Sequence, residues 1–225
     1  PFMSEVSVTN MVEVMAKVFI GEEISETYNT LDCGVIGIKS PVFSYNRFKG
    51  SDPVAQVEMS STGEVACIGR DILQTFYMSW LGVGQQINKK VILLSVDDKY
   101  KQKLLPLVQA LSNDGWQFVA TGGTHEMLVN NGVQSKFVFK ISDLIEPNIQ
   151  RTISKREVGL IINLPKDVFS SDADSDGFKI RRLAIDFHIP LVTNFQLSEA
   201  LLESLALFHG KPFKVESYRE LVRNG

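Results

Sequence analysis

The sequence of 225 residues is poor in the features that mark several protein classes. Its two cysteines, Cys33 and Cys67, are too few for a disulfide framework and are typical of reduced thiols in an intracellular protein. No run approaches the roughly 18 apolar residues of a membrane-spanning helix, and no signal-peptide pattern is present. The three histidines are scattered and lack the spacing of metal ligands. We therefore expect a cytoplasmic protein with no membrane partner and no resident metal.

A large excess of charge is also missing. The net charge is −3, which gives no reason to expect nucleic acid as a partner. Residues 1–88 carry 5 basic and 10 acidic side chains, and the remaining residues carry 18 and 16, so the two parts have charges of −5 and +2. The second part is therefore the better host for an anion.

The composition, with 44% hydrophobic and 22% charged residues, is that of an ordinary globular protein of one large or two small domains. Because the chain begins at Pro1, we expect a piece of a longer protein. Residues 1–88 predict two helices, 10–20 and 71–81, and two strands, 35–38 and 42–45, which Pro41 divides. These few elements predict the end of a larger α+β domain.

From residue 89 the pattern changes to short apolar strands that alternate with amphipathic helices. This alternation predicts a doubly wound parallel α/β sheet over residues 89–225. The expected strands are 91–96, 116–120, 137–141, 158–162 and 190–192. A helix is expected after each of the five strands. The third helix is expected at 149–155 and the last at 197–207.

A threonine–glycine–glycine–threonine turn, Thr121, Gly122, Gly123 and Thr124, follows the second of these strands and opens a helix. A tight glycine turn at a helix N-terminus directs backbone N–H groups and two hydroxyls toward one point, as in phosphate and carboxylate sites. Four residues alone are a weak motif, and a purely structural βα loop is the alternative.

Polar residues also follow the other predicted strands, where ligands of doubly wound sheets bind. They are Asp97–Lys101, Lys140, Asn163–Lys166 and Thr193–Asn194. Lysines, amides and hydroxyls gathered at one edge predict an anion pocket. The alternative, that strand ends are polar because loops are, stays open.

With these residues assembled, the chain resembles the C-terminal end of the large subunit, or synthetase region, of carbamoyl-phosphate synthetase. The resemblance covers nearly the whole chain. In the first part it rests on Pro1–Ser7, Pro41–Phe48, Asp52–Pro53 and the run Glu58–Gly69, which resemble the end of that family's second ATP-grasp domain. In the second part it rests on Thr121–Thr124, Ile161–Pro165, Ile180–Ala184 and Ile189–Asn194, which resemble its regulatory domain of methylglyoxal-synthase-like fold.

The resemblance implies an ATP-dependent ligase of pyrimidine or arginine biosynthesis that makes carbamoyl phosphate from bicarbonate, two ATP and nitrogen from ammonia or glutamine. ATP and Mg²⁺ or Mn²⁺ would bind upstream of Pro1, so no catalytic residue and no cofactor is expected within these residues. The implied partners are the other synthetase domains, a glutamine amidotransferase subunit or domain and an allosteric effector, with a homo-oligomer possible. The effector site implied by the resemblance comprises Lys101, Thr121, Gly122, Gly123, Thr124, Lys140 and Asn163.

The identity of the effector stays open. Members activated by acetylglutamate have a tryptophan near the position of Lys140 and an asparagine at the position of Gly177. Residues Asn163–Pro165 and Thr193–Gln196 nevertheless resemble that branch, whose members are mitochondrial. A lysine is a strong point-charge partner for phosphate. We therefore favour a phosphorylated effector, a uridine nucleotide or phosphoribosyl pyrophosphate.

Several other functions are weaker hypotheses. The run Asp172–Gly177 resembles half of a calcium loop, but Leu183 stands where the loop needs glutamate. A methylglyoxal-synthase-type lyase would need a carboxylate base, for which Asp143 and Glu146 are candidates in the wrong context. The Lys-x-Leu-His-Pro run of the inosinate cyclohydrolase of purine synthesis is absent. His125 lies beside the predicted pocket, and Arg181 and Arg182 are expected to form structural ion pairs. A structural platform with a vacant pocket is a further alternative.

Overall fold

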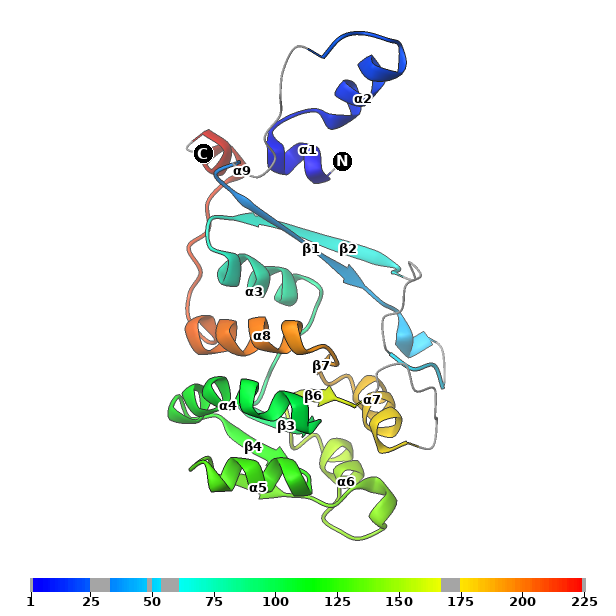
Figure 1. Cartoon of the computed structure of the whole chain (residues 1–225), viewed down its shortest axis with the longest axis vertical. Coiled ribbons are helices and arrows are strands. Elements are labelled where there is room, and N and C mark those ends of the chain that lie inside the picture. Colours follow the sequence, from blue (N-terminus) through cyan, green and yellow to red (C-terminus); the bar gives the residue numbers. More distant parts are fainter. Residues whose placement is uncertain (1, 25–32, 48–49, 54–60, 167–174, 224–225) are drawn as a thin grey trace. The chain divides into compact units, whose positions relative to one another are not determined.

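The computed structural model describes residues 2–24, 33–47, 50–53, 61–166 and 175–223. By its internal contacts the chain divides into two compact units (Figure 1). The first comprises Pro1–Val42, Gly63–Gly84 and Phe208–Gly225, and the second comprises Phe43–Thr62 and Gln85–Leu207. The division of the sequence into domains at residue 88 stays a prediction.

The first unit is built on an antiparallel pair of strands, β1 (Ile36–Val42) and β2 (Gly63–Gly69), against which helix α3 (Ile72–Gly82) packs. The predicted break at Pro41 is wrong. Pro41 lies inside β1 opposite Glu64, because a two-stranded sheet has only edge strands, in which an unpaired proline nitrogen costs no ladder bond. The predicted second strand at 42–45 is instead the end of β1 and the start of a 3-10 turn, η1 (Tyr45–Arg47).

The helices of the first unit begin where polar side chains can cap them. Asn10 accepts a hydrogen bond from the N–H of Glu13 at 3.1 Å, and Asp71 accepts one from Gln74 at 2.7 Å, which satisfies N–H groups that the helix leaves free. Both predicted helices are thereby confirmed. The predicted helices are α2 (Met11–Phe19) and α3. Two further helices in the described part of this unit, α1 (Phe2–Ser7) and α9 (Tyr218–Arg223), were not predicted.

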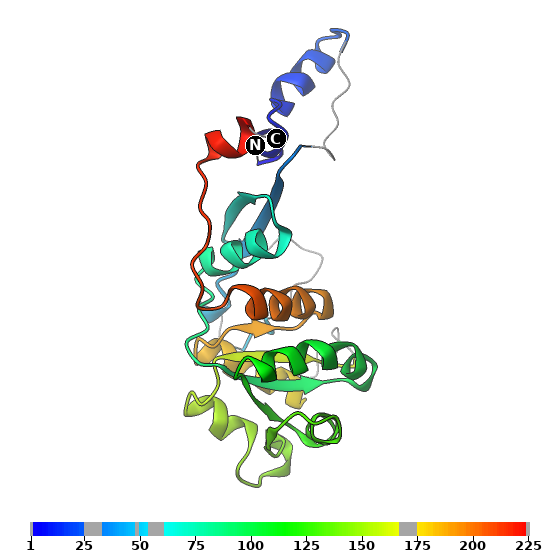
Figure 2. The ribbon, with the colours of Figure 1, turned by 90° about the vertical axis from the view of Figure 1, so that its left-hand side faces the viewer.

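The second unit is a five-stranded parallel sheet in the order β5-β4-β3-β6-β7, which confirms the predicted α/β class (Figures 1 and 2). Its strands are β3 (Val91–Val96), β4 (Gln117–Ala120), β5 (Ser135–Phe137), β6 (Leu160–Leu164) and β7 (Leu191–Val192). Its helices are α4 (Asp98–Asn113), α5 (Gly122–Asn130), α6 (Ile149–Ser154), α7 (Asp176–Asp186) and α8 (Phe195–Phe208), with a 3-10 turn, η2 (Ile141–Asp143).

The sheet is covered on both faces, as its continuous apolar strands require. Leu93, Val119 and Ile161 pack on one face with residues of α6 and α7. The alternate strand residues point to the other face, where α4 contacts α5 and α8 lies beside α4 in both ribbon views (Figures 1 and 2). The predicted doubly wound arrangement is therefore confirmed.

Two strands lie two residues away from their predicted positions. The third predicted strand, 137–141, is β5 at Ser135–Phe137, and the fourth, 158–162, is β6 at Leu160–Leu164. The second shift is important for function, because it places Asn163 inside a strand instead of after it.

Candidate functional site

The site lies at the carboxyl edge of the sheet, where β3 and β6 adjoin and the strand order reverses. From β3 the chain proceeds to β4 on one side, and the later strand β6 pairs with β3 on the other. The N–H of Asp97, after β3, donates to the carbonyl of Leu164 at 2.8 Å and joins the two strand ends. Such a switch point is where doubly wound sheets open a crevice for ligands.

The Thr121–Thr124 turn is one wall of this site. Thr121 is the N-cap residue of α5, and its carbonyl accepts hydrogen bonds from the N–H groups of Thr124 and His125, both at 2.9 Å. Its side chain makes no capping hydrogen bond. Gly122 and Gly123 form the first turn of a nine-residue helix, whose N–H groups carry partial positive charge.

Thr124 has a different environment from the one expected. Its side chain is 3% exposed, and Oγ1 lies 3.3 Å from the carbonyl oxygen and 3.4 Å from the amide nitrogen of Val96. The hydroxyl thus ties α5 to the end of β3. Of the two threonines, Thr121 is the one whose hydroxyl makes no described hydrogen bond, and the residue is 8% exposed.

Lys101 approaches the same turn from α4. A Cβ built on Gly123 would lie only 2.9 Å from the Lys101 Nζ, so the absence of a side chain at residue 123 leaves room for the ammonium group. Nζ also pairs with Asp98 at 2.5 Å, and the Lys101 side chain is only 13% exposed. The hydrogen bond and charge of Lys101 lower the pKa of the Asp98 carboxyl. A positive charge is therefore held beside the N-terminus of α5.

Asn163 lies in β6, the strand next to β3, and is paired with Ser95 of β3. It is 2% exposed, and its Oδ1 accepts a hydrogen bond from Arg181 Nη1 at 3.2 Å. The structure therefore places Lys101, Thr121, Gly122, Gly123, Thr124 and Asn163 at one edge of the sheet.

Lys140 is the exception among the expected residues. It follows β5, the outer strand, and is exposed. Its backbone N–H donates to Asp143 Oδ2 at 3.0 Å, while no described contact joins its ammonium group to the other expected residues. Lys140 is therefore the one expected residue that the structure places away from the β3–β6 edge, and its role stays a prediction.

The arginines of α7 are engaged in ion pairs, as predicted. Arg181 donates from Nε and Nη2 to the two oxygens of Asp52, at 2.7 and 2.5 Å. Arg182 pairs with Asp186 and donates to the carbonyl groups of Tyr45 and Ser51. Asp52 was not expected at the site. It is 129 residues from Arg181, and no local pattern in the sequence indicated it.

The residues proposed for the weaker hypotheses have structural roles. Asp143 holds the backbone of Lys140, and Glu146 pairs with Arg151, so the structure adds nothing to the lyase hypothesis. His125 Nδ1 lies 2.8 Å from Ser135 Oγ. The first half of the run Asp172–Gly177, residues 172–174, is outside the described residues. Among the residues that are described, no three metal-ligating side chains gather, and no helix is long and apolar enough to cross a bilayer. Cys33 and Cys67 are not joined in a disulfide.

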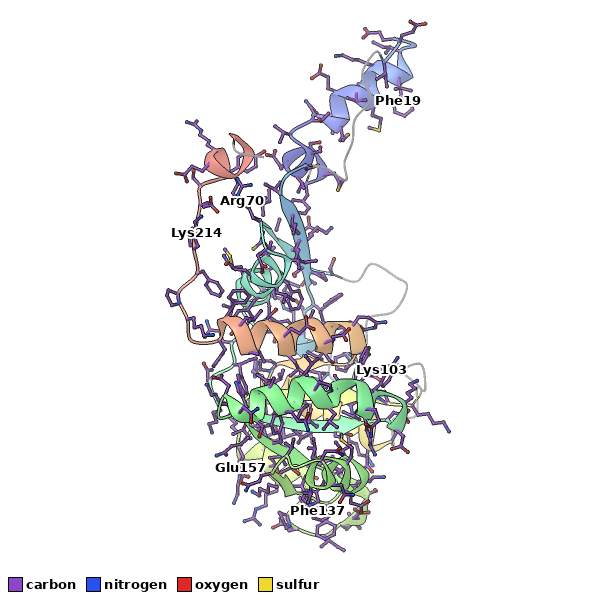
Figure 3. The ribbon with its side chains drawn as sticks, turned by 60° about the vertical axis from the view of Figure 1, so that its left-hand side comes forward. Phe19, Arg70, Lys103, Phe137, Glu157 and Lys214 are labelled. Carbon is purple, nitrogen blue, oxygen red and sulfur yellow. The ribbon has the colours of Figure 1, made fainter. Side chains whose placement is uncertain are left out.

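A hollow of about 440 Å³ lies elsewhere in the second unit, around α6. Its lining alternates in charge, because Lys136 pairs with Glu157 at 3.0 Å and Arg151 pairs with Glu146. Glu157, labelled in Figure 3, has its pKa lowered by the hydrogen bond from Lys136. The hollow lies away from the carboxyl ends of the central strands β3 and β6, and none of the expected effector-site residues lines it.

Comparison with known proteins agrees with this architecture. Residues 103–193 match the family model of the MGS-like domain. A crystal structure of methylglyoxal synthase from Elizabethkingia anophelis is 21% identical, with a TM-score of 0.44 over 58% of this chain and 88% of that one. By the family match, residues 103–193 of the second unit form an MGS-like domain.

Longer proteins are similar to nearly the whole chain. The chain is 36% identical to the multifunctional protein URA2 of Saccharomyces cerevisiae over 92% of its length, and 34% identical over 91% to the mitochondrial carbamoyl-phosphate synthase [ammonia] of Homo sapiens. It is also 34% identical over 94% to the multifunctional protein CAD of Squalus acanthias. The chain is therefore homologous to a part of these synthase and multifunctional proteins, as its sequence motifs predicted. It spans 10% of the first and third of these relatives and 14% of the second.

Proposed function

We propose that this chain is the C-terminal regulatory portion of a carbamoyl-phosphate synthetase and that the edge of its parallel sheet binds an anionic allosteric effector. The observation that carries the proposal is the ammonium group of Lys101, which lies over Gly123 at the N-terminus of α5. A fixed cation, free N–H groups and the Thr121 hydroxyl converge there, which is the chemistry that holds phosphate or carboxylate oxygens.

The parent enzyme would join bicarbonate, two ATP and nitrogen from glutamine or ammonia. In this proposal residues 1–88 end an ATP-grasp domain, ATP and Mg²⁺ or Mn²⁺ bind elsewhere, and an amidotransferase subunit or domain is a partner. The similarity to multifunctional proteins and to a synthase supports linked domains of this kind. The effector acts by binding two states of the synthetase with different affinity.

A phosphorylated effector, a uridine nucleotide or phosphoribosyl pyrophosphate, suits the site better than acetylglutamate. Lys101 offers a point charge with little exposure, and Lys140 stands where acetylglutamate-activated members have tryptophan. Gly177, at the position of their asparagine, lies against Arg181 and Asn163, since a Cβ there would be 3.1 Å from Arg181 Nη1. Acetylglutamate is the competing hypothesis and would also place the enzyme in mitochondria.

Calorimetric titration of the intact protein with uridine triphosphate, phosphoribosyl pyrophosphate and acetylglutamate tests this function. We expect Lys101→Met to weaken binding of the phosphorylated ligands at least tenfold, because a charge-assisted contact to phosphate is lost. Lys103→Met is the matched control. Lys103, on the same helix α4, lies over the ring of Phe195 at 5.6 Å (Figure 3), and its loss should leave affinity unchanged. Absence of binding by all three ligands to the folded protein contradicts the proposal.

The ion pair of Lys101 leads to a second prediction. Asp98 competes with an anionic ligand for the same ammonium group, so Asp98→Asn should tighten binding of phosphoribosyl pyrophosphate about two- to fivefold. Because the pKa of Asp98 is lowered, its charge persists into mild acid. The gain should therefore be constant near neutral pH and vanish only below the ordinary range of a carboxyl group. The gain in affinity and its dependence on pH are measured by calorimetric titration of both proteins at several pH values.

Asp114→Asn is the control for this second prediction. It removes a similar surface pair, between Lys90 and Asp114 at 3.2 Å, at the other end of α4. A gain in affinity of the same size in both variants would show a general effect of net charge and would contradict competition at Lys101.

A further inference from the structure

A partly buried chain of polar contacts connects the candidate site to a distant part of the sequence. Asp52 binds the Arg181 guanidinium through both carboxylate oxygens, and the remaining Nη1 of that guanidinium donates to Asn163 Oδ1. The Arg181 side chain is 3% exposed and that of Asp52 is 24% exposed. A planar fork held at two points by a carboxylate has a fixed orientation, so its third contact is fixed as well.

This arrangement determines which way the Asn163 amide points. An amide group has one oxygen that accepts and one nitrogen that donates. Because Oδ1 is held by the guanidinium, Nδ2 must point away from Arg181, and its N–H groups are the ones that suit an anion. Gly177 contributes by leaving space, since a Cβ there would lie 3.1 Å from Nη1 and 3.7 Å from Asn163 Oδ1.

We propose that Asp52 is a positioning residue for the effector site: through Arg181 it orients the Asn163 amide to donate to the anion. The inference rests on the proposed function. Asp52 neutralises the buried guanidinium and prevents it from rotating toward the anion itself. Asp52 also lies in the segment Phe43–Thr62, which joins β1 to β2. Effector binding is thereby coupled to a segment that lies outside residues 103–193, the range that the MGS-like family model matches.

Arg182 provides a matched comparison on the same helix. It too binds an aspartate, Asp186, through two nitrogens, and it donates to carbonyl groups of the same segment, at Tyr45 and Ser51. No described contact joins Arg182 to Asn163. Asp186→Asn therefore removes an equivalent charge from α7 without changing the orientation of the site amide.

The test is a double-mutant cycle between Asp52 and Asn163, read by calorimetric titration of the intact protein with phosphoribosyl pyrophosphate and uridine triphosphate. We expect Asp52→Asn to weaken binding about three- to tenfold and Asn163→Ala about tenfold. The double variant should bind like Asn163→Ala alone, because Asp52 acts only through that amide. Asp186→Asn should bind like the unchanged protein. Additive losses, or unchanged affinity in Asp52→Asn, overturn the inference.

A second variant covers the case in which Asp52→Asn does not fold. Gly177→Ala keeps Asp52 and Arg181 and displaces only the end of the guanidinium. Like Asp52→Asn, it should therefore weaken binding of the two probes. In the Asn163→Ala background it should have no effect. An equal loss in both backgrounds overturns the inference. If the unchanged, folded protein binds neither probe nor acetylglutamate, the proposed function fails, and the inference fails with it. If the unchanged protein binds a probe but the losses of affinity in the two single variants add up in the double variant, only the inference fails and the proposed function stands.

Discussion

Gly159→Ala is expected to unfold a large fraction of the protein at temperatures where the unchanged protein is folded. A Cβ at this residue would lie 2.2 Å from the carbonyl oxygen, 2.9 Å from the amide nitrogen and 3.0 Å from the carbonyl carbon of Lys89. All three are backbone atoms, so no side-chain rotation relieves the overlap. Gly159 also donates its N–H to the carbonyl of Val91 at 2.8 Å, which fixes the start of β6 against β3.

To admit one methyl group, the two central strands must separate at their first residues, and Gly159 must give up its bond to Val91. We expect a loss of about 3 kcal/mol or more in the free energy of unfolding, because overpacking of a rigid site and a lost buried hydrogen bond act together. Denaturant unfolding followed by circular dichroism measures it.

Gly122→Ala is the control for this prediction. A Cβ at Gly122 meets nothing within 4 Å, and Gly122 is the first residue of α5, so the change should leave stability the same or raise it slightly. Equal losses at the two glycines would show that backbone freedom, and not the close approach to Lys89, decides the effect.

Gly159 also explains why the sequence predicted β6 in the wrong place. Residues 158–164 are apolar apart from Gly159 and Asn163, and a strand buried on both faces has no alternation of polar residues to mark its ends. The ladder with β3 begins at Leu160 because Gly159 is in contact with Lys89. The helices predicted at 10–20 and 71–81 were located more accurately, since Asn10 and Asp71 cap their first turns locally.

The sequence predicted those parts of the candidate site that lie next to the ends of strands in the chain. The Thr121–Thr124 turn, Lys101 and Asn163 follow or end strands, and parallel strands bring such residues to one edge. The partner of Asn163 was not predictable. Arg181 reaches it from the next helix, and Asp52 orients Arg181 from 129 residues away. No periodicity or motif spacing contains that information, because it arises from packing between distant segments.

The surface of α2 illustrates the same limit. Met11, Val14, Met15 and Val18 have the helical spacing that predicts this helix, but the spacing alone does not say whether a partner covers the apolar side. The structure shows Phe19, labelled in Figure 3, at 79% exposure and Met15 at 52%. A periodic apolar pattern predicts a helix, and only contacts decide whether its apolar face is buried.

Ile161→Ala is expected to have an effect of similar size, and it connects the core to the candidate site. Ile161 is fully buried in β6, and its backbone N–H bonds to the carbonyl of Pro190 at 2.9 Å. Its side chain belongs to the cluster that also contains Ile180 and Ala184 of α7. Truncation to alanine removes three carbon atoms and leaves a cavity, which costs about 2–5 kcal/mol of unfolding free energy.

The same face of β6 carries Ile161 and Asn163, because residues two apart in a strand point the same way. On α7, Ile180 and Ala184 meet the apolar residue, and Arg181 meets the amide. Packing at Ile161 thus holds α7 at the distance from β6 that the bond between Arg181 and Asn163 needs. Ile145→Ala, the same substitution at a residue that is 51% exposed, should cost less than about 0.5 kcal/mol. Equal losses in the two variants, measured by denaturant unfolding, would mean that Ile161 does not hold α7 against the sheet.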